Sequence, residues 1–203
     1  MSRPAGTIAL VDYGAGNLRS VENALREVGA AVNVTRDPEA VRTADRIVVP
    51  GQGSMPECAE AMRRSGVAGA LREAVDRGTP VLGICVGLQI LFEEGEEAGG
   101  ARGLGLLPGR VERLPGDVKL PHIGWSPVRL VGDAPLFAPL DGQYVYFAHS
   151  YAAPAGAPGA ALLATHGRPY CAALARGNLY AVQFHPEKSQ AVGLGLLRRF
   201  VEA

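Results

Sequence analysis

The 203-residue sequence lacks net charge, since 20 lysine and arginine side chains balance 20 aspartate and glutamate side chains. A chain without a positive field has no electrostatic basis for binding nucleic acid or an anionic membrane, so neither partner is expected. Apolar runs are short, and none approaches the roughly 20 residues needed to span a bilayer. Residues 1–6 lack the basic and apolar regions of a signal peptide, so we expect a cytoplasmic protein.

Cysteine is also scarce, and the three positions are Cys58, Cys85 and Cys171. An odd number of widely spaced cysteines without a Cys-x-x-Cys pair argues against a disulfide framework and against a structural zinc site. No metal is therefore expected, and the thiols are free for other uses.

The first half of the sequence alternates apolar runs with helical periodicity. Strands are expected at residues 7–12, 31–35, 46–50 and 80–84. Helices are expected from residue 18 to 28, after the Asp37-Pro38 cap, along a stretch ending near Gly78, and at 86–92. This alternation predicts an α/β fold, with a mostly parallel sheet covered by helices on both faces.

The second half changes character after Gly99. Apolar segments between Gly/Pro turns predict strands near residues 110–114, 125–131, 144–149, 161–165, 170–175 and 179–184. They suggest a mixed or antiparallel extension of the same sheet, followed by a last helix capped by Ser189. Since no repeat and no interdomain linker is visible, we expect a single domain over residues 1–203.

The segment Gly83-Ile84-Cys85-Val86-Gly87 lies between an expected strand and an expected helix. A nucleophile on a sharp strand-to-helix turn needs small neighbours, which the two glycines provide. The helix directs backbone N–H groups and the positive end of its dipole toward Cys85, and this stabilises negative charge there. The alternative is a small buried cysteine that fills the junction, and the pentapeptide alone leaves both interpretations open.

A cysteine nucleophile needs a base, and His185-Pro186-Glu187 supplies a histidine with a carboxylate close in sequence. The imidazole can exchange a proton with Cys85, while the carboxylate orients the ring and stabilises its charged form. The segment follows an expected strand, so it should lie at the sheet edge where α/β folds bind ligands. Taken alone it could be a solvated turn. The rival bases, without an acid so near, are His122, His149 and His166.

A glycine-rich turn, Pro50-Gly51-Gln52-Gly53, follows the third expected strand. Glycines there let backbone N–H groups turn toward a developing negative charge, which would form an oxyanion site beside the nucleophile. The alternative is an ordinary turn that enters a helix. The acidic pairs Glu93-Glu94 and Glu96-Glu97 are interpreted as a solvated loop and helix end without a functional role.

Three motifs follow one another in a fixed order, and together they resemble the class I, or triad-type, glutamine amidotransferases. They are residues 50–53 (PGQG), 83–89 (GICVGLQ) and 183–187 (QFHPE). The resemblance spans essentially the whole chain. It implies a flavodoxin-like three-layer fold and hydrolysis of the side-chain amide of glutamine without a cofactor.

The resemblance implies a catalytic triad of Cys85, His185 and Glu187. Cys85 would attack the amide carbon and His185 would protonate the departing ammonia. The resulting glutamyl thioester would then be hydrolysed to glutamate. The positions implied to hold the oxyanion or the substrate are Gly51, Gln52, Gly53, Val86, Gln89, His149, Ser150 and Tyr151.

Within the class, further segments are similar to the glutaminase subunits of imidazole glycerol phosphate synthase. They are residues 12–17 (DYGAGN), 121–125 (PHIGW), 146–151 (YFAHSY) and 185–189 (HPEKS). The similarity implies a (β/α)₈-barrel cyclase partner in histidine biosynthesis, which uses the ammonia to make imidazole glycerol phosphate and aminoimidazole-carboxamide ribotide. The positions implied to face the cyclase are Asn17, Trp125, Tyr146 and Lys188.

Two positions depart from the pattern of that family. Ser126 stands where asparagine usually follows the Gly-Trp pair, and Gln52 stands where the oxyanion turn usually has a small aliphatic residue. Neither position belongs to the implied triad.

Other functions remain open on these residues. The glutaminase subunits of pyridoxal-phosphate synthase and of anthranilate or aminodeoxychorismate synthase are rivals, but they lack segments 12–17 and 121–125 in combination. A freestanding cysteine hydrolase on a similar fold would hydrolyse peptides or polyglutamates without a partner. A regulatory subunit without activity would only bind, and the intact Cys85, His185 and Glu187 argue against it.

Overall fold

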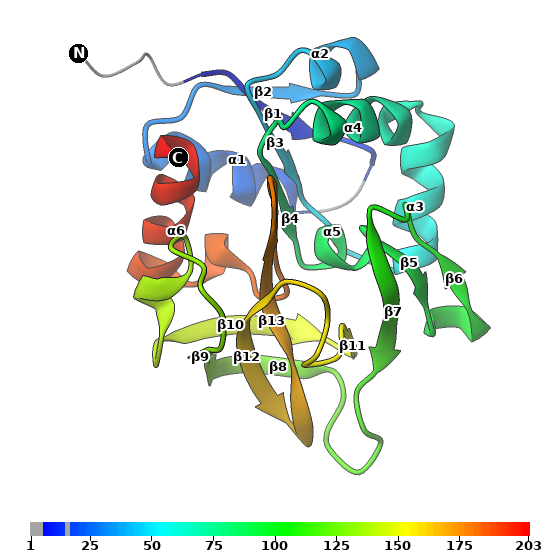
Figure 1. The fold of residues 1–203 in the computed structure, drawn as a ribbon, viewed down its shortest axis with the longest axis vertical. Helices are drawn as coiled ribbons and strands as arrows, with labels where there is room; N and C mark the ends of the chain where they lie inside the picture. The colour runs from blue at the N-terminus through cyan, green and yellow to red at the C-terminus, as the bar shows by residue number, and fades with distance from the viewer. Residues whose placement is uncertain (1–5, 15–16) are drawn as a thin grey trace.

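The structure, a computed structural model, describes residues 6–14 and 17–203 and is built around an eight-stranded sheet. Its strand order is β2-β1-β3-β4-β14-β13-β12-β9 (Figure 1). The strands from β2 to β14 in this order are parallel, and β13, β12 and β9 extend the sheet in antiparallel fashion. The bounds are β1 Ile8–Val11, β2 Val32–Thr35, β3 Arg46–Val49, β4 Val81–Ile84, β9 Arg129–Leu130, β12 Ala160–His166, β13 Arg168–Arg176 and β14 Leu179–Val182. The predicted α/β fold with a mostly parallel sheet is confirmed.

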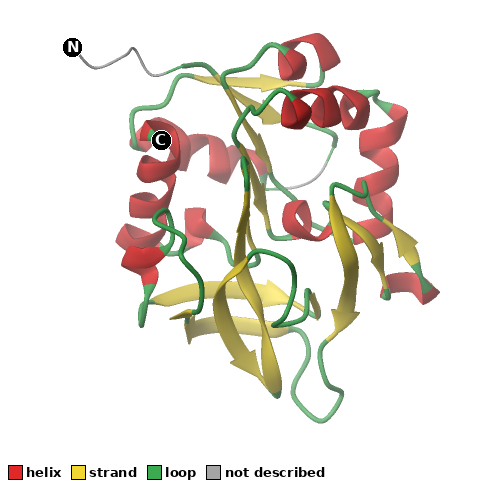
Figure 2. Ribbon diagram, viewed as in Figure 1, coloured by secondary structure: helices red, strands yellow, loops and turns green. Residues whose placement is uncertain are grey.

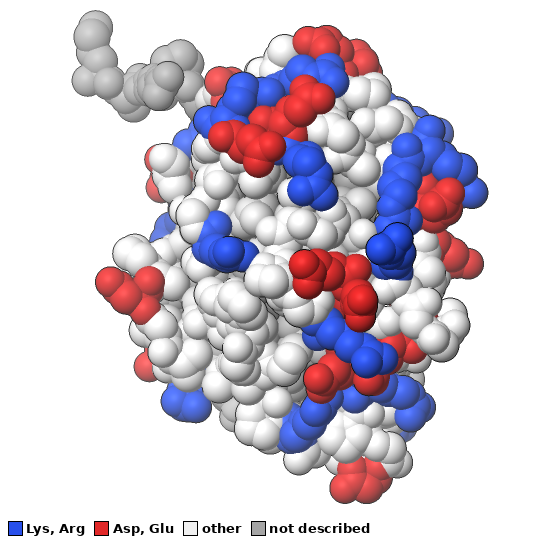
Figure 3. Space-filling view, turned by 45° about the vertical axis from the view of Figure 1, so that its right-hand side comes forward, with Lys and Arg blue, Asp and Glu red and all other residues white. Residues whose placement is uncertain are grey.

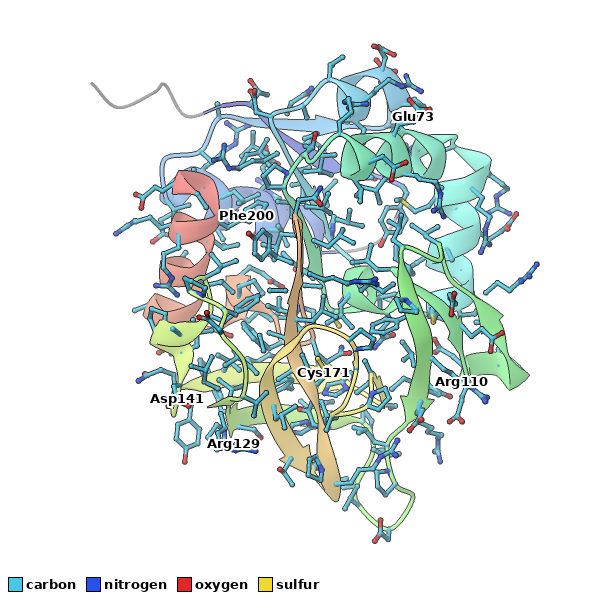
Figure 4. All side chains as sticks on the ribbon, in the orientation of Figure 1. Glu73, Arg110, Arg129, Asp141, Cys171 and Phe200 are labelled. Atoms are coloured by element: carbon cyan, nitrogen blue, oxygen red, sulfur yellow. The ribbon has the colours of Figure 1, made fainter. Side chains whose placement is uncertain are left out.

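Helices cover both faces of this sheet, so the molecule has three layers (Figure 2). α1 (Leu18–Glu27) and α6 (Gln190–Glu202) lie on one face, and α3 (Met55–Arg64), α4 (Val67–Asp76) and α5 (Val86–Gln89) lie on the other. α2 (Pro38–Arg42) packs against α4. Phe200, labelled in Figure 4, is fully buried on the side of α6 that faces the sheet.

Local sequence signals account for the elements of the first half. β1, β3 and β4 are apolar runs because a parallel strand covered on both faces meets no solvent. The Asp37 carboxylate accepts a hydrogen bond from the Glu39 N–H and so caps α2, with Pro38 at the first helical position. Gly29 follows α1 with a left-handed φ of 90°, which glycine adopts without strain.

Two helix predictions are wrong in extent. The helical stretch expected to end near Gly78 is two helices, α3 and α4, and the break lies at Gly66, whose φ is 76°. The helix expected at 86–92 ends at Gln89, and Phe92 begins strand β5 (Phe92–Gly95). The carbonyl of Ile90 accepts a hydrogen bond from the Leu104 N–H, a long-range pairing that the apolar run by itself cannot reveal.

The second half forms two smaller sheets in addition to the antiparallel extension. β11 (Tyr151–Ala152), β7 (Leu107–Arg113), β5 and β6 (Ala101–Arg102) form a four-stranded sheet, and β10 (Tyr144–His149) pairs with β8 (His122–Pro127) in a two-stranded ribbon. The expected strands 110–114 and 144–149 exist, but placing them in the main sheet is wrong. Sequence patterns predict strands, whereas pairing partners depend on long-range packing.

The acidic residues after Leu91 also behave differently from the solvated loop that was expected. Glu93 and Glu94 lie on β5. The carboxylates of three of the acids accept backbone N–H groups from Gly109, Arg113 and Met55, and these acids are Glu93, Glu96 and Glu97 respectively. They therefore stabilise the ends of neighbouring elements.

Charged side chains of both signs lie next to one another on the face shown in Figure 3. Such interspersed charges produce no broad field of one sign. Among the helices of the described residues, none has the length and apolar character required to cross a membrane.

Candidate active site

The carboxyl ends of adjacent parallel strands bring the sequence motifs together. Cys85 follows β4, the turn at residues 50–53 follows β3, and His185 lies just beyond β14. β4 lies between β3 and β14 in the sheet, and the Cys85 N–H donates a 2.8 Å hydrogen bond to the Val182 carbonyl. The three motifs therefore meet at the edge where open α/β sheets bind ligands.

Cys85 occupies a strained backbone position between β4 and α5. Its φ is 55° and its ψ is −110°, values that residues other than glycine rarely adopt. A Cβ at Gly87 would collide with the Val49 carbonyl oxygen, and a Cβ at Gly83 would lie 2.7 Å from the Gly87 oxygen. The glycines on both sides of Cys85 are thus required because α5 lies directly against β3 and β4. The strained turn predicted from the pentapeptide is present.

His185 and Glu187 form a buried ion pair behind the thiol. The Nδ1 of His185 lies 2.8 Å from Oε1 of Glu187, and the two side chains are 4% and 0% exposed. Asn17 Nδ2 donates a 2.5 Å hydrogen bond to the same Glu187 oxygen. Asn17 was predicted to face a partner protein, and its contact with Glu187 was not foreseen.

The surroundings of His185 keep its imidazole charged at neutral pH. Burial acts to lower the pKa of His185, but hydrogen bonds to Cys85 and Glu187 outweigh it and raise the pKa from 6.5 to about 10. Because Nδ1 is bonded to Glu187, Nε2 is the nitrogen left to face the sulfur. The histidine can therefore deliver a proton to a group leaving from a Cys85 adduct.

Cys85 opens onto a pocket of about 210 Å³, below the roughly 300–1,000 Å³ typical of drug-sized ligands. Many of its lining residues were predicted from the sequence, namely Gly53, Cys85, Val86, Gln89, His149, Ser150 and Tyr151. Residues that were not predicted also line it, namely Glu97, Pro121 and Ala148. Glu97 lies in the acidic stretch, where no periodicity or motif distinguishes it from a solvated acid.

Two buried glutamines connect the pocket wall to the thiol. Gln89 Nε2 donates to the Tyr151 carbonyl at 2.9 Å and to Gln183 Oε1 at 3.1 Å. Gln183 Nε2 in turn lies 3.7 Å from the Cys85 sulfur as a donor. Gln89 and Tyr151, both predicted to bind substrate, are thus joined by a hydrogen bond. Gln183, the first residue of the third motif, is an additional contact of the sulfur.

The glycine turn after β3 is fixed by contacts with α5 and with Tyr13. Gly51 is buried, and a Cβ there would collide with the Gly87 backbone nitrogen. The Tyr13 hydroxyl donates a 2.5 Å hydrogen bond to the Pro50 carbonyl. Gly53 lines the pocket, whereas Gln52 is exposed and lies outside the lining.

The β8–β10 ribbon presents an apolar outer face. Trp125 pairs with Tyr146 across the strands, their rings are 6.1 Å apart, and Lys188 Nζ lies 5.7 Å from the Tyr146 ring centroid. On the same face Ile123 is 63% exposed and Tyr144 59%. Three of the residues predicted to face a partner therefore cluster on one surface. Ala15 and Gly16 of segment 12–17 lie outside the described residues.

Ser189 connects this ribbon to the segment that contains His185 and Glu187. It precedes α6 as predicted, but its hydroxyl does not cap the helix. Instead it donates to the His185 carbonyl at 2.7 Å and accepts from the Tyr146 N–H at 3.0 Å. The His185 N–H also donates to the Tyr146 carbonyl at 2.9 Å. The backbone of His185 is thus held by the ribbon.

Within the described part of the chain, no cluster of three or more His, Cys, Asp or Glu side chains is arranged to hold a metal ion. The arrangement at Cys85 instead combines a thiol, a charged imidazole and a buried carboxylate, which suits nucleophilic attack on a carbonyl compound.

Comparisons with known proteins agree with this arrangement. The family model for class-I glutamine amidotransferases matches residues 9–203. The imidazole glycerol phosphate synthase subunit HisH of Syntrophotalea carbinolica is 46% identical over 202 residues, which cover 95% of this chain and 98% of that protein. The protein of the same name from Symbiobacterium thermophilum is 50% identical over 192 residues, covering 94% and 91%. A solved glutamine amidotransferase has a TM-score of 0.75 at 23% identity, with 96% of this chain and 97% of that chain covered, which shows a shared flavodoxin-like fold.

Proposed function

This chain belongs to the class I glutamine amidotransferases and, within them, to the HisH glutaminase subunits of imidazole glycerol phosphate synthase, and we propose that Cys85, His185 and Glu187 are its catalytic triad. Residues 1–203 act as one glutaminase domain, in the cytoplasm. The observation that carries this assignment is the buried Glu187–His185 ion pair beside the sulfur of a strained Cys85, at the common edge of β4 and β14.

The reaction begins when the Cys85 sulfur attacks the side-chain amide carbon of glutamine. The tetrahedral oxyanion is stabilised by N–H groups at the start of α5, such as that of Val86, and in the turn that contains Gly51. His185 then gives its Nε2 proton to the amide nitrogen, the C–N bond breaks, and ammonia leaves a glutamyl thioester. Water that gives a proton to the same imidazole adds to the thioester, and glutamate is released with the thiol regenerated.

The pocket supplies groups that suit the rest of the glutamine molecule. Glu97 lines the pocket, and its second carboxylate oxygen, the one not bonded to the Met55 N–H, can pair with the substrate ammonium group. The Ser150–Tyr151 stretch offers polar backbone groups for the substrate carboxylate. Gln89 and Gln183 fix the position of the Tyr151 carbonyl at the pocket wall relative to the Cys85 sulfur.

Ammonia is the product that must reach a second active site. In neutral water most of it is protonated, and ammonium has no lone pair for attack. A sealed passage into a bound (β/α)₈-barrel cyclase preserves its reactivity. The exposed apolar face around Trp125 and Tyr146, beside Lys188 and next to the triad, supports this ribbon as the docking surface.

A reconstituted assay tests this function. Glutamate release is measured for the chain alone, with a cyclase subunit, and with cyclase plus its nucleotide substrate. We expect a low rate for the isolated chain and a large stimulation in the complex, because the oxyanion donors align only when the partner binds. Equal rates in the three conditions would refute the coupling, and hydrolysis of peptides or polyglutamates without a partner would favour a freestanding hydrolase.

Replacing Trp125 by alanine should weaken cyclase binding by about 10- to 100-fold, since buried tryptophans are frequent hot spots of interfaces. The affinity can be measured by titration calorimetry. Val34→Ala is the control, because Val34 is 36% exposed but lies on β2, at the end of the main sheet opposite to β9. If both variants bind as the original chain does, the docking surface lies elsewhere.

A further inference from the structure

A chain of buried polar side chains runs from the ribbon to the pocket wall. His149 Nδ1 lies 2.9 Å from the Tyr151 carbonyl oxygen, and its Nε2 lies 3.3 Å from the Tyr170 hydroxyl. The same hydroxyl lies 3.1 Å from His122 Nδ1. His122 Nε2 then lies 3.0 Å from the Ser126 hydroxyl. Three of these side chains, His122, His149 and Tyr170, are at most 5% exposed.

The hydrogen positions in this series of hydrogen bonds have one consistent solution when the rings of His122 and His149 are both neutral. A carbonyl oxygen only accepts, so His149 carries its proton on Nδ1 and has an unprotonated Nε2. The Tyr170 hydroxyl must then donate to His149, and its remaining lone pairs accept from His122 Nδ1. His122 is consequently unprotonated at Nε2 and accepts from the Ser126 hydroxyl. Each group therefore donates its proton to the next one in the order that leads from Ser126 to the Tyr151 carbonyl.

The environment supports this order of protons. Burial lowers the pKa of His149 to about 3 and the pKa of His122 to about 4, so both rings are neutral at physiological pH. Burial raises the pKa of Tyr170, which therefore keeps its proton. His166 stacks on His122 with ring centroids 4.2 Å apart. Its Nε2 bonds to the Lys119 carbonyl, so His166 is not part of the series from Ser126 to Tyr151.

We propose that Tyr170 is a positioning residue for glutamine binding, because its hydroxyl orients His149 and thereby holds the Tyr151 carbonyl at the pocket wall. The inference rests on the proposed glutaminase function. The Tyr151 carbonyl also accepts the Gln89 Nε2 proton, so its position determines where Gln89 and the adjoining substrate-binding backbone lie. Tyr170 stands on β13 of the main sheet, while His149 and His122 stand on the ribbon. The tyrosine therefore joins the ribbon to the rigid part of the fold.

The kinetic test compares Tyr170→Phe with the original chain in the complex with cyclase. Phenylalanine fills the same space but leaves His149 Nε2 and His122 Nδ1 without their partner. We expect the KM for glutamine to rise by about tenfold, because buried polar groups left unpaired are costly and His149 and the Tyr151 carbonyl shift to find other partners. The kcat should change little, because Cys85 and His185 are untouched. Tyr180→Phe is the control. Tyr180 packs between Phe137 and Phe200 and pairs with Ala175 on β13, so it does not belong to the hydrogen-bonded series.

A fall in kcat of about tenfold with an unchanged KM would overturn the proposal. So would a KM for Tyr170→Phe equal to that of Tyr180→Phe. Nitrogen-15 NMR of histidine-labelled protein tests the proton order without any activity. We expect the Nδ1–H tautomer for His122 and His149 and the Nε2–H tautomer for His166. An Nε2–H tautomer at His149 would refute the proposal. If instead the original chain releases no glutamate in the complex, the proposed function fails, whatever the tautomers.

Discussion

Replacing Cys85 by alanine should abolish glutamine hydrolysis in the complex with cyclase. Removing the nucleophile of a triad typically lowers kcat by about 10⁶-fold, because the remaining groups cannot form the covalent intermediate. Alanine retains the Cβ of cysteine, so the substitution adds no backbone strain at φ 55°. The release of glutamate, followed by a coupled assay, measures the effect.

The same variant separates catalysis from scaffolding. Synthesis by the cyclase from added ammonium salts should survive in the Cys85→Ala complex, since the partner still receives ammonia from solution. Cys171→Ala is the matched control, because that thiol, labelled in Figure 4, is fully buried on β13, donates to the Ala173 carbonyl and does not line the pocket. Persistence of glutamine-dependent synthesis in Cys85→Ala would instead support a regulatory subunit that only binds.

Replacing Glu187 by glutamine should lower glutaminase activity by about 10⁴-fold, the loss expected when the acid of a triad becomes an amide. Glutamine keeps an oxygen that can accept from His185 and Asn17, so the geometry is retained. Without the carboxylate, the pKa of His185 falls from its value of about 10. The imidazole is then less often charged and delivers its proton less readily. NMR titration of the His185 ring measures the shift directly.

The same ion pair predicts how stability depends on pH. A folded-state pKa raised above 6.5 adds stability that is complete below pH 6.5 and is lost as the pH rises through about 10. In Glu187→Gln this loss should become smaller and occur at lower pH. Glu94→Gln is the control, since Glu94 is exposed on β5. An unchanged His185 midpoint in Glu187→Gln would show that the carboxylate does not stabilise the charged ring.

Much of the candidate site could be predicted because it depends on local sequence. Glycines on both sides of Cys85 indicated a tight strand-to-helix turn, and the apolar strand before His185 indicated that this histidine lies at the end of a strand. The parallel pairing of that strand with β4 was not predicted, because the second half was expected to form a mixed or antiparallel extension. Open α/β sheets bind ligands at the edge where strands end, so Cys85 and His185, 100 positions apart in sequence, were expected to meet there. The structure brings Cys85, His185 and Glu187 together at that edge.

Other features required the tertiary structure. The sequence by itself determined the alternation of strands and helices in the first half, the order of the motifs and the residues that could react, since these follow from periodicity and side-chain chemistry. It assigned Phe92 to a helix, whereas the folded chain has Phe92 at the start of β5. Only the folded chain decided that Asn17 bonds to Glu187, that Glu97 lines the pocket, and that Tyr170 joins two histidines. These contacts link elements far apart in sequence, and their formation depends on how the ribbon packs against the main sheet, for which no local pattern exists.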